Sequence, residues 1–168
     1  MSIYMRWMKF ILVALFFFVT GFISGMITKK NDKEINLLHK HMEKLSWYFR
    51  ILNMWIEMKQ NEKSVVTYLR QKGINRIAIY GMRELGERFY EEVRNTGIEV
   101  VCIIDKIPDL VVGDFMVISP KQKIPEVDAI IVTADFYYQE IKKELKLKVN
   151  CPVYSLSGVI GNSFGRYL

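Results

Sequence analysis

The residues best suited to chemistry are two glycines, Gly81 and Gly86, with an acidic residue, Asp105, downstream of them. The segment 81–86, GMRELG, stands between an apolar run and a helical pattern, where a dinucleotide-binding turn of the form G-x-G-x-x-G occurs. In such a turn the first glycine permits a tight bend, the last allows close helix–sheet packing, and the helix N-terminus attracts phosphate. Asp105 ends the next apolar run, where a carboxylate can accept ribose hydroxyls.

The segment departs from this fingerprint at its third position, where Arg83 replaces the glycine that lets a pyrophosphate approach the backbone. One interpretation is that the guanidinium itself reaches a phosphate and gives a site for a mononucleotide, a sugar nucleotide or another phosphorylated ligand. The other interpretation is that the bulk of Arg83 closes the pocket and leaves an architectural domain.

The sequence offers little support for catalysis. Tyr138 and Lys142 have the Y-x-x-x-K spacing of short-chain dehydrogenases, but no serine stands at a matching upstream position. Cys102 lies in an apolar run, and the C-terminal part of the chain contains no histidine to activate it. His39 and His41 point away from each other on a helix, so they predict no metal site. We do not expect an enzyme, and an NAD(P)-dependent enzyme stays an alternative.

Short apolar runs alternate with helical patterns through the C-terminal part of the chain. Apolar strands that alternate with helices predict an α/β domain over 61–168, with a small Rossmann-like parallel sheet and helical cover. Cys102 and Cys151 are expected to be small core residues, and Glu87, Glu91 and Glu92 to form a solvated helix face. The predicted strands are 77–80, 99–104, 115–118, 129–132 and 153–155, and the predicted helices are 64–72, 85–94 and 136–147.

The segments IAIYGMRELGERFYEEVRNTGIEVVCIIDK and PEVDAIIVTA give this part of the chain a likeness to a known group of domains. Residues 75–156 resemble the Rossmann-like NAD(P)- or nucleotide-binding domains of bacterial cell-surface polysaccharide biosynthesis proteins. Such domains are attached to sugar acetyltransferases, epimerases and sugar-phosphate transferases, whose catalytic domains have no counterpart here. The resemblance implies NAD(P) or a sugar nucleotide as ligand, with Ala134 at the mouth of the fourth strand. The implied cofactor-binding residues are Gly81, Met82, Arg83, Gly86, Asp105 and Thr133.

The N-terminal part of the chain carries the longest apolar run. Residues 10–27 contain no charge, and Lys29 and Lys30 follow directly. Eighteen helical residues rise about 27 Å, close to the thickness of a hydrocarbon core, so we expect a transmembrane anchor over 1–30. A cleaved signal peptide and a buried helix are the alternatives. The lysines after the run predict a single-pass protein of the plasma membrane with its C-terminal domain in the cytoplasm.

A heptad pattern follows over 31–60 and predicts a helical stalk, in which apolar residues recur at alternating steps of three and four. With Gly21-x-x-x-Gly25, this seam predicts a homodimer through a parallel coiled coil. The alternative is an amphipathic helix folded on its own domain. Residues 47–58 are apolar on nearly all sides, which predicts that this half also packs on the globular domain. The seam residues are Ile35, Leu38, Met42, Leu45, Phe49, Leu52 and Ile56.

Charge is distributed unevenly along the chain. The net charge of the whole chain is +6, and residues 73–168 contain 12 basic and 13 acidic side chains. A domain that is nearly neutral and has no basic stripe is not expected to bind nucleic acid. Together these features predict a membrane-anchored accessory or regulatory component of cell-surface polysaccharide synthesis, with the enzymes of that synthesis as partners. A non-catalytic scaffold with a vestigial pocket is the alternative.

Overall fold

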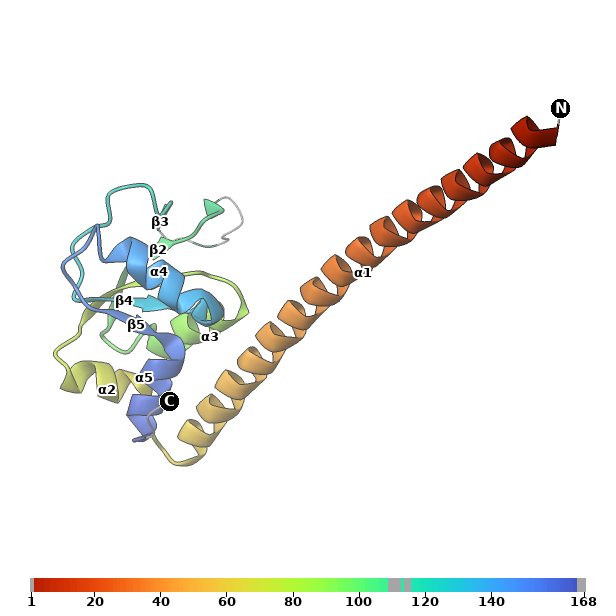
Figure 1. Cartoon of the computed structure of the whole chain (residues 1–168). Coiled ribbons are helices and arrows are strands. Elements are labelled where there is room, and N and C mark those ends of the chain that lie inside the picture. The colour runs from red at the N-terminus through yellow and green to blue at the C-terminus, as the bar shows by residue number, and fades with distance from the viewer. Residues whose placement is uncertain (1, 109–112, 114–115, 166–168) are drawn as a thin grey trace. The chain divides into compact units, whose positions relative to one another are not determined.

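The computed structural model describes residues 2–108, 113 and 116–165, and before residue 29 it describes the side chains of 7–8, 15–22 and 26. The chain divides into two compact units, Met1–Ser46 and Trp47–Leu168. The first helix, α1 (Ser2–Gln60), forms the first unit and supplies the beginning of the second (Figure 1).

The N-terminal part of α1 differs from the prediction. Among the residues that the structure describes, no helix is long and apolar enough to cross a membrane. This finding contradicts the predicted transmembrane anchor and its single-pass topology. Of the two glycines predicted to bring two helices together, Gly21 lies in open space, since a Cβ added there would meet no atom within 4 Å. Gly25 lies outside the residues whose side chains are described.

Five strands form one parallel sheet in the order β3-β2-β1-β4-β5 (Figure 1). This is the order of the first five strands of a doubly wound sheet, and it confirms the predicted α/β arrangement with parallel strands. The start of the third predicted strand, at Phe115, lies outside the described residues. The strands are β1 (Arg76–Tyr80), β2 (Glu99–Ile104), β3 (Val117–Ile118), β4 (Ala129–Val132) and β5 (Val153–Ser155).

Helices cover both faces of the sheet unequally. The end of α1 packs on one face with α2 (Val65–Gln71), α3 (Glu84–Val93) and α5 (Leu156–Phe164). The 3-10 turn η2 (Asp135–Tyr137) leads into α4 (Tyr138–Leu145), which packs on the other face. The sequence did not predict α5, whose glycines are poor helix formers. It forms because it is buried and because Ser155 caps it by accepting a hydrogen bond from the Gly158 N–H.

The second half of α1 belongs to the core of the domain. Ile51, Trp55 and Met58 are 1%, 7% and 0% exposed and lie in the same apolar cluster as residues of α2, α3 and α5. These three positions recur every three or four residues, so they share one face of the helix. The predicted packing of 47–58 on the domain is confirmed.

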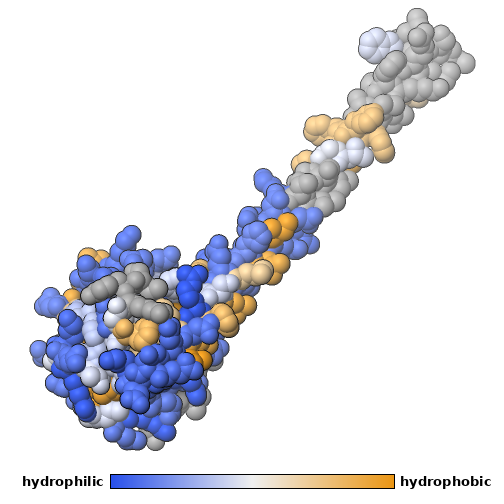
Figure 2. Space-filling view, turned by 90° about the horizontal axis from the view of Figure 1, so that it is seen from below, coloured by the Kyte–Doolittle hydropathy of each residue, from blue (hydrophilic) through white to orange (hydrophobic). Residues whose placement is uncertain are grey.

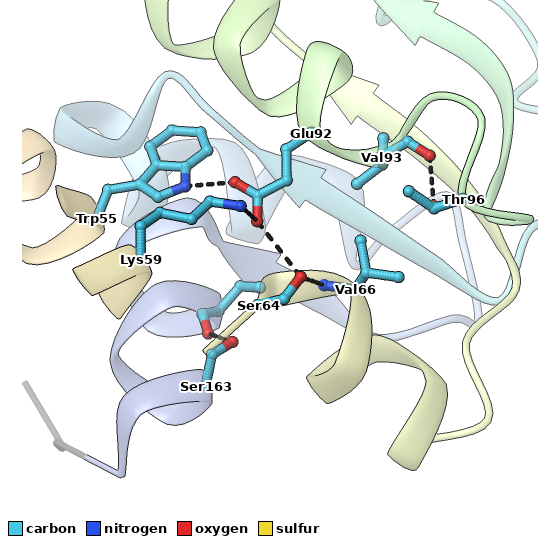
Figure 3. Close-up of polar contacts among 9 residues, drawn as sticks. Trp55, Lys59, Ser64, Val66, Glu92, Val93, Thr96 and Ser163 are labelled. Carbon is cyan, nitrogen blue, oxygen red and sulfur yellow. Dashed lines mark hydrogen bonds and ion pairs between the residues drawn. The ribbon is translucent and has the colours of Figure 1, made fainter. Parts of the chain in front are cut away.

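A single carboxylate, that of Glu92 on α3, joins three helices (Figure 3). Its two oxygens lie 2.6 Å from Trp55 Nε1 and 2.7 Å from Lys59 Nζ, both on α1. The hydroxyl of Ser64, the N-cap of α2, lies 3.5 Å away. The Glu92 side chain is only 8% exposed, so the prediction that it belongs to a solvated helix face is wrong. The error arises because α1 covers this side of α3.

We expect Glu92→Ala to lower the free energy of unfolding by about 2–3 kcal/mol, because the buried Trp55 indole N–H and the Lys59 ammonium would lose their acceptor. Urea unfolding of the full chain, followed by circular dichroism, measures this loss. Glu91→Ala is the matched control. Glu91 is half-exposed and pairs with Arg94 one turn away, so its removal should cost less than about 0.5 kcal/mol. Equal losses in the two variants would contradict the assignment.

Candidate functional site

The segment 81–86 lies at the carboxyl edge of the sheet, directly after β1. The chain runs from β1 to β2 on one side of β1, whereas β4 pairs with β1 on its other side. The order of the strands therefore reverses at β1. In open parallel sheets, ligands bind outside the carboxyl ends of the strands at such a switch point.

The two glycines are packed against each other and against Thr133, the residue that follows β4. Gly81 has a φ of +92°, which other residues adopt only with strain. A Cβ on Gly86 would lie under 3.0 Å from the Gly81 carbonyl oxygen. The Thr133 hydroxyl lies 2.5 Å from that oxygen and 3.1 Å from the Tyr80 carbonyl oxygen. Thr133 is 3% exposed, so its hydroxyl holds the turn rather than facing a ligand.

Asp105 also reaches the turn. Its Oδ2 accepts a hydrogen bond from the Met82 N–H at 3.2 Å, and its Oδ1 accepts one from the Ile107 N–H at 2.9 Å. The structure thus brings Gly81, Met82, Gly86, Asp105 and Thr133 together at one edge of the sheet. A carboxylate has about four acceptor positions, so Asp105 retains capacity for a ribose hydroxyl beyond these two bonds.

Arg83 is the N-cap residue of α3, and its side chain is exposed. The cap has no side-chain hydrogen bond, and the guanidinium forms no ion pair with the described part of the chain. A helix start that lacks a side-chain cap presents its first N–H groups to an anion. Arg83 is therefore an exposed cation beside the start of α3, and it does not fill the turn.

Sequence reasoning missed Asp135, which is 4% exposed at the same edge of the sheet. Its Oδ1 accepts a hydrogen bond from the Ser157 N–H at 2.8 Å, and its Oδ2 accepts one from Trp47 Nε1 at 2.9 Å. The carboxylate therefore occupies the N-terminus of α5 and ties it to α1. The N–H group of Ser157 belongs to the first turn of α5. Since the sequence did not predict this helix, it gave no reason to expect an acid at the helix N-terminus.

Tyr80, the last residue of β1, places a buried hydroxyl on the α4 face of the sheet. Its oxygen finds no hydrogen-bond partner among the described residues. Burial, with the negative charges of Glu144 and Asp105, raises the pKa of Tyr80 to about 12. The hydroxyl is thus protonated at neutral pH and is not set up as a general base.

We expect Tyr80→Phe to leave the protein as stable as the original at pH 7, or more stable by about 1 kcal/mol, since it removes an unpaired buried hydroxyl. The raised pKa means that the folded state holds the tyrosine proton more tightly than the unfolded state. Stability from this group is complete below pH 10 and is lost as the pH rises toward 12. Thermal melts should therefore show a larger gain in Tm of Tyr80→Phe over the parent chain at pH 11 than at pH 7. A variant less stable at both values would show a partner for the hydroxyl.

The alternative catalytic residues are committed to structure. The Tyr138 hydroxyl donates to the Val153 carbonyl oxygen at 2.9 Å, and the Lys142 ammonium lies 5.0 Å from the centre of the tyrosine ring. Tyr138 thus ties α4 to β5, and Lys142 packs on the tyrosine ring within α4. Burial raises the pKa of the Cys102 thiol to about 11, so it is not a thiolate at neutral pH. Cys102 is buried, as predicted, and Cys151 is half-buried.

Comparison with known protein families finds a match for the domain that contains the candidate site. Residues 73–154 match the model of a family described as C2185-like, N-terminal. The matched segment begins just before β1 and ends within β5, so it includes the first four strands, most of β5 and the turn at 81–86. No curated protein and no solved structure matches the chain significantly. The domain with the candidate site is therefore similar to the N-terminal domain of the C2185-like family over just under half of the chain.

Proposed function

We propose that the domain binds a nucleotide, either NAD(P) or a sugar nucleotide, at the turn 81–86. The observation that carries the proposal is the position of this turn, at the switch point of the sheet and at the start of α3. Arg83 supplies a cation for the phosphates, the α3 N-terminus supplies N–H groups, and Asp105 supplies acceptors for a ribose. The bonds of Thr133 and Asp105 hold the turn in place before the ligand arrives.

The biological role we propose is an accessory or regulatory one in cell-surface polysaccharide synthesis. Its support is the resemblance of residues 75–156 to nucleotide-binding domains of that pathway. Tyr138, Lys142 and Cys102 are committed to structural roles, which favours binding without turnover.

Binding is tested by isothermal titration of the full chain with NAD, NADP and uridine diphosphate sugars. A ligand present at 100 times its dissociation constant should also stabilise the fold by about 2.7 kcal/mol. Asp105 predicts that NAD binds more tightly than NADP, because a carboxylate repels a 2′-phosphate.

Substitution of Arg83 tests whether the phosphates bind at this site or respond only to the overall charge of the domain. We expect Arg83→Ala to weaken binding about tenfold, as loss of one charge-assisted contact to phosphate would. Arg88→Ala is the matched control, because Arg88 lies on the same helix, is well exposed and, among the described residues, forms an ion pair with Glu87 alone, at 3.5 Å. It should change the affinity less than about twofold. If none of these ligands binds, or if Arg83→Ala and Arg88→Ala lose the same affinity, the proposal is rejected and the architectural interpretation is favoured.

A further inference from the structure

The second half of α1 has an apolar face that its own domain leaves uncovered. Ile51, Trp55 and Met58 are buried in the domain core, as described above. On the same helical segment, three more apolar residues stand in the solvent: Phe49 is 69% exposed, Leu52 40% and Ile56 56%. A helix that packs only on its own domain needs one apolar face. The second apolar face is therefore not accounted for by packing on this domain.

The unit Met1–Ser46 shows the same feature further along α1. Ile35, Leu38, Met42 and Leu45 are each more than half exposed. Between residues 30 and 60, eight large apolar side chains are exposed, and seven of them are the residues of the heptad seam. Leu37 is the exception. Figure 2 shows apolar side chains following one another along one edge of α1, with hydrophilic side chains on the opposite edge.

We propose that a second copy of this chain covers the seam, and that residues 35–56 of the two copies form a parallel two-stranded coiled coil. The alternating steps of three and four are those that bring a and d residues of two supercoiled helices together. The occupant must match a seam of about 33 Å. In the described part of the chain, the longest other helix is α3 with 10 residues, so α1 of another molecule is the helix that fits.

The residues beside the seam are compatible with this pairing. In the heptad register, Glu34, His41, Tyr48 and Trp55 occupy g positions, and His39, Ser46 and Asn53 occupy e positions. Of these, Trp55 packs in the core of its own domain. A parallel pair places each g residue opposite the following e residue of the partner, which sets Glu34 against His39 and His41 against Ser46. No two like charges meet at these positions.

The area is sufficient for a specific interface. Seven side chains from each copy, each 40–69% exposed, would together bury on the order of 1,000 Å² of apolar surface. This value is near the lower bound of stable interfaces. The dimer is therefore expected to dissociate at low concentration, which makes its affinity measurable.

Sedimentation of the full chain over a range of concentrations tests the pairing. Leu38→Glu places a charge in the seam of each copy and should raise the dissociation constant of the dimer at least about 100-fold. Leu37→Glu is the matched control, because the adjacent leucine is 57% exposed against 59% for Leu38 but lies off the seam. It should leave the constant within about threefold. A monomeric parent chain, or equal effects of the two substitutions, would overturn the proposal.

Orientation is tested by oxidation of a cysteine variant. In a parallel coil the two Leu38 positions face each other, so Leu38→Cys should form a covalent dimer under mild oxidation. The parent chain, which keeps Cys102 and Cys151, and the variant Leu37→Cys should not. A non-covalent dimer in which Leu38→Cys fails to cross-link would exclude the parallel arrangement.

Discussion

Replacing Gly86 with alanine is expected to lower the free energy of unfolding by about 2–4 kcal/mol, one of the two largest effects predicted for this chain. The new Cβ would lie under 3.0 Å from the Gly81 carbonyl oxygen, which is a backbone atom and cannot rotate away. The Thr133 hydroxyl, 3.2 Å from the same position, crowds the added carbon further. Alanine is otherwise the better helix former, so a loss of stability here isolates the steric cost.

Urea unfolding of Gly86→Ala and of Glu87→Ala measures this effect against a neighbour. Glu87 follows on the same turn of α3 but is exposed, so its truncation should change stability by less than about 0.5 kcal/mol. If Gly86→Ala proved as stable as the parent chain, the close approach of α3 to the turn would be wrong. The candidate site would then lose the geometry on which the proposed binding depends.

Asp135→Ala is expected to have the other large effect and to lower the free energy of unfolding by about 2–4 kcal/mol. Truncation leaves the indole N–H of Trp47 and the buried N–H of Ser157 without their acceptor, and it removes a negative charge from the start of α5. The end of α1 and the start of α5 would both lose an attachment at the edge of the sheet. We therefore expect a lower unfolding midpoint together with a change in tryptophan fluorescence.

A double-mutant cycle separates the contact with Trp47 from the rest of this loss. In Asp135→Asn the amide oxygen can still accept from Ser157, and the amide nitrogen then faces the Trp47 indole. Combining Asp135→Asn with Trp47→Phe should therefore show a coupling of about 1–2 kcal/mol. Asp135→Asn combined with Trp55→Phe is the control and should be additive, because Trp55 donates to Glu92 instead. Equal coupling in the two cycles would contradict the assigned contact.

The prediction of the sheet succeeded because its strands are short, apolar runs bounded by glycine, proline and charged residues. Local pattern alone indicates such strands, and their alternation with helices indicates parallel pairing. The turn at 81–86 was found for a similar reason, since its glycines are required by the backbone itself. Gly81 has a positive φ, and Gly86 approaches another backbone segment too closely for a side chain.

Three predictions from the sequence were wrong or incomplete: the membrane anchor, the C-terminal helix and the environment of Glu92. Each depends on the length of a helix or on contacts with residues far along the chain. The membrane anchor was inferred from a run of apolar letters, and among the described residues no helix is apolar over a sufficient length. The short helix α5 was missed because its glycines argue against a helix and only its burial and its cap stabilise it. Glu92 was assigned to solvent because nothing in its neighbourhood along the chain shows that α1 lies over it.

The sequence by itself determined the strands, the glycine turn and the seam of α1, because each depends on spacing between residues that are close along the chain. Only the tertiary structure decided which carboxylates are structural. Glu92 and Asp135 bind Trp55 and Trp47, residues that lie 37 and 88 positions away, whereas Asp105 reaches the turn across 23 positions. The energy of a buried carboxylate depends on the donors that surround it. Those donors come from other elements, so folding and not local pattern distinguishes a structural acid from an acid at a site.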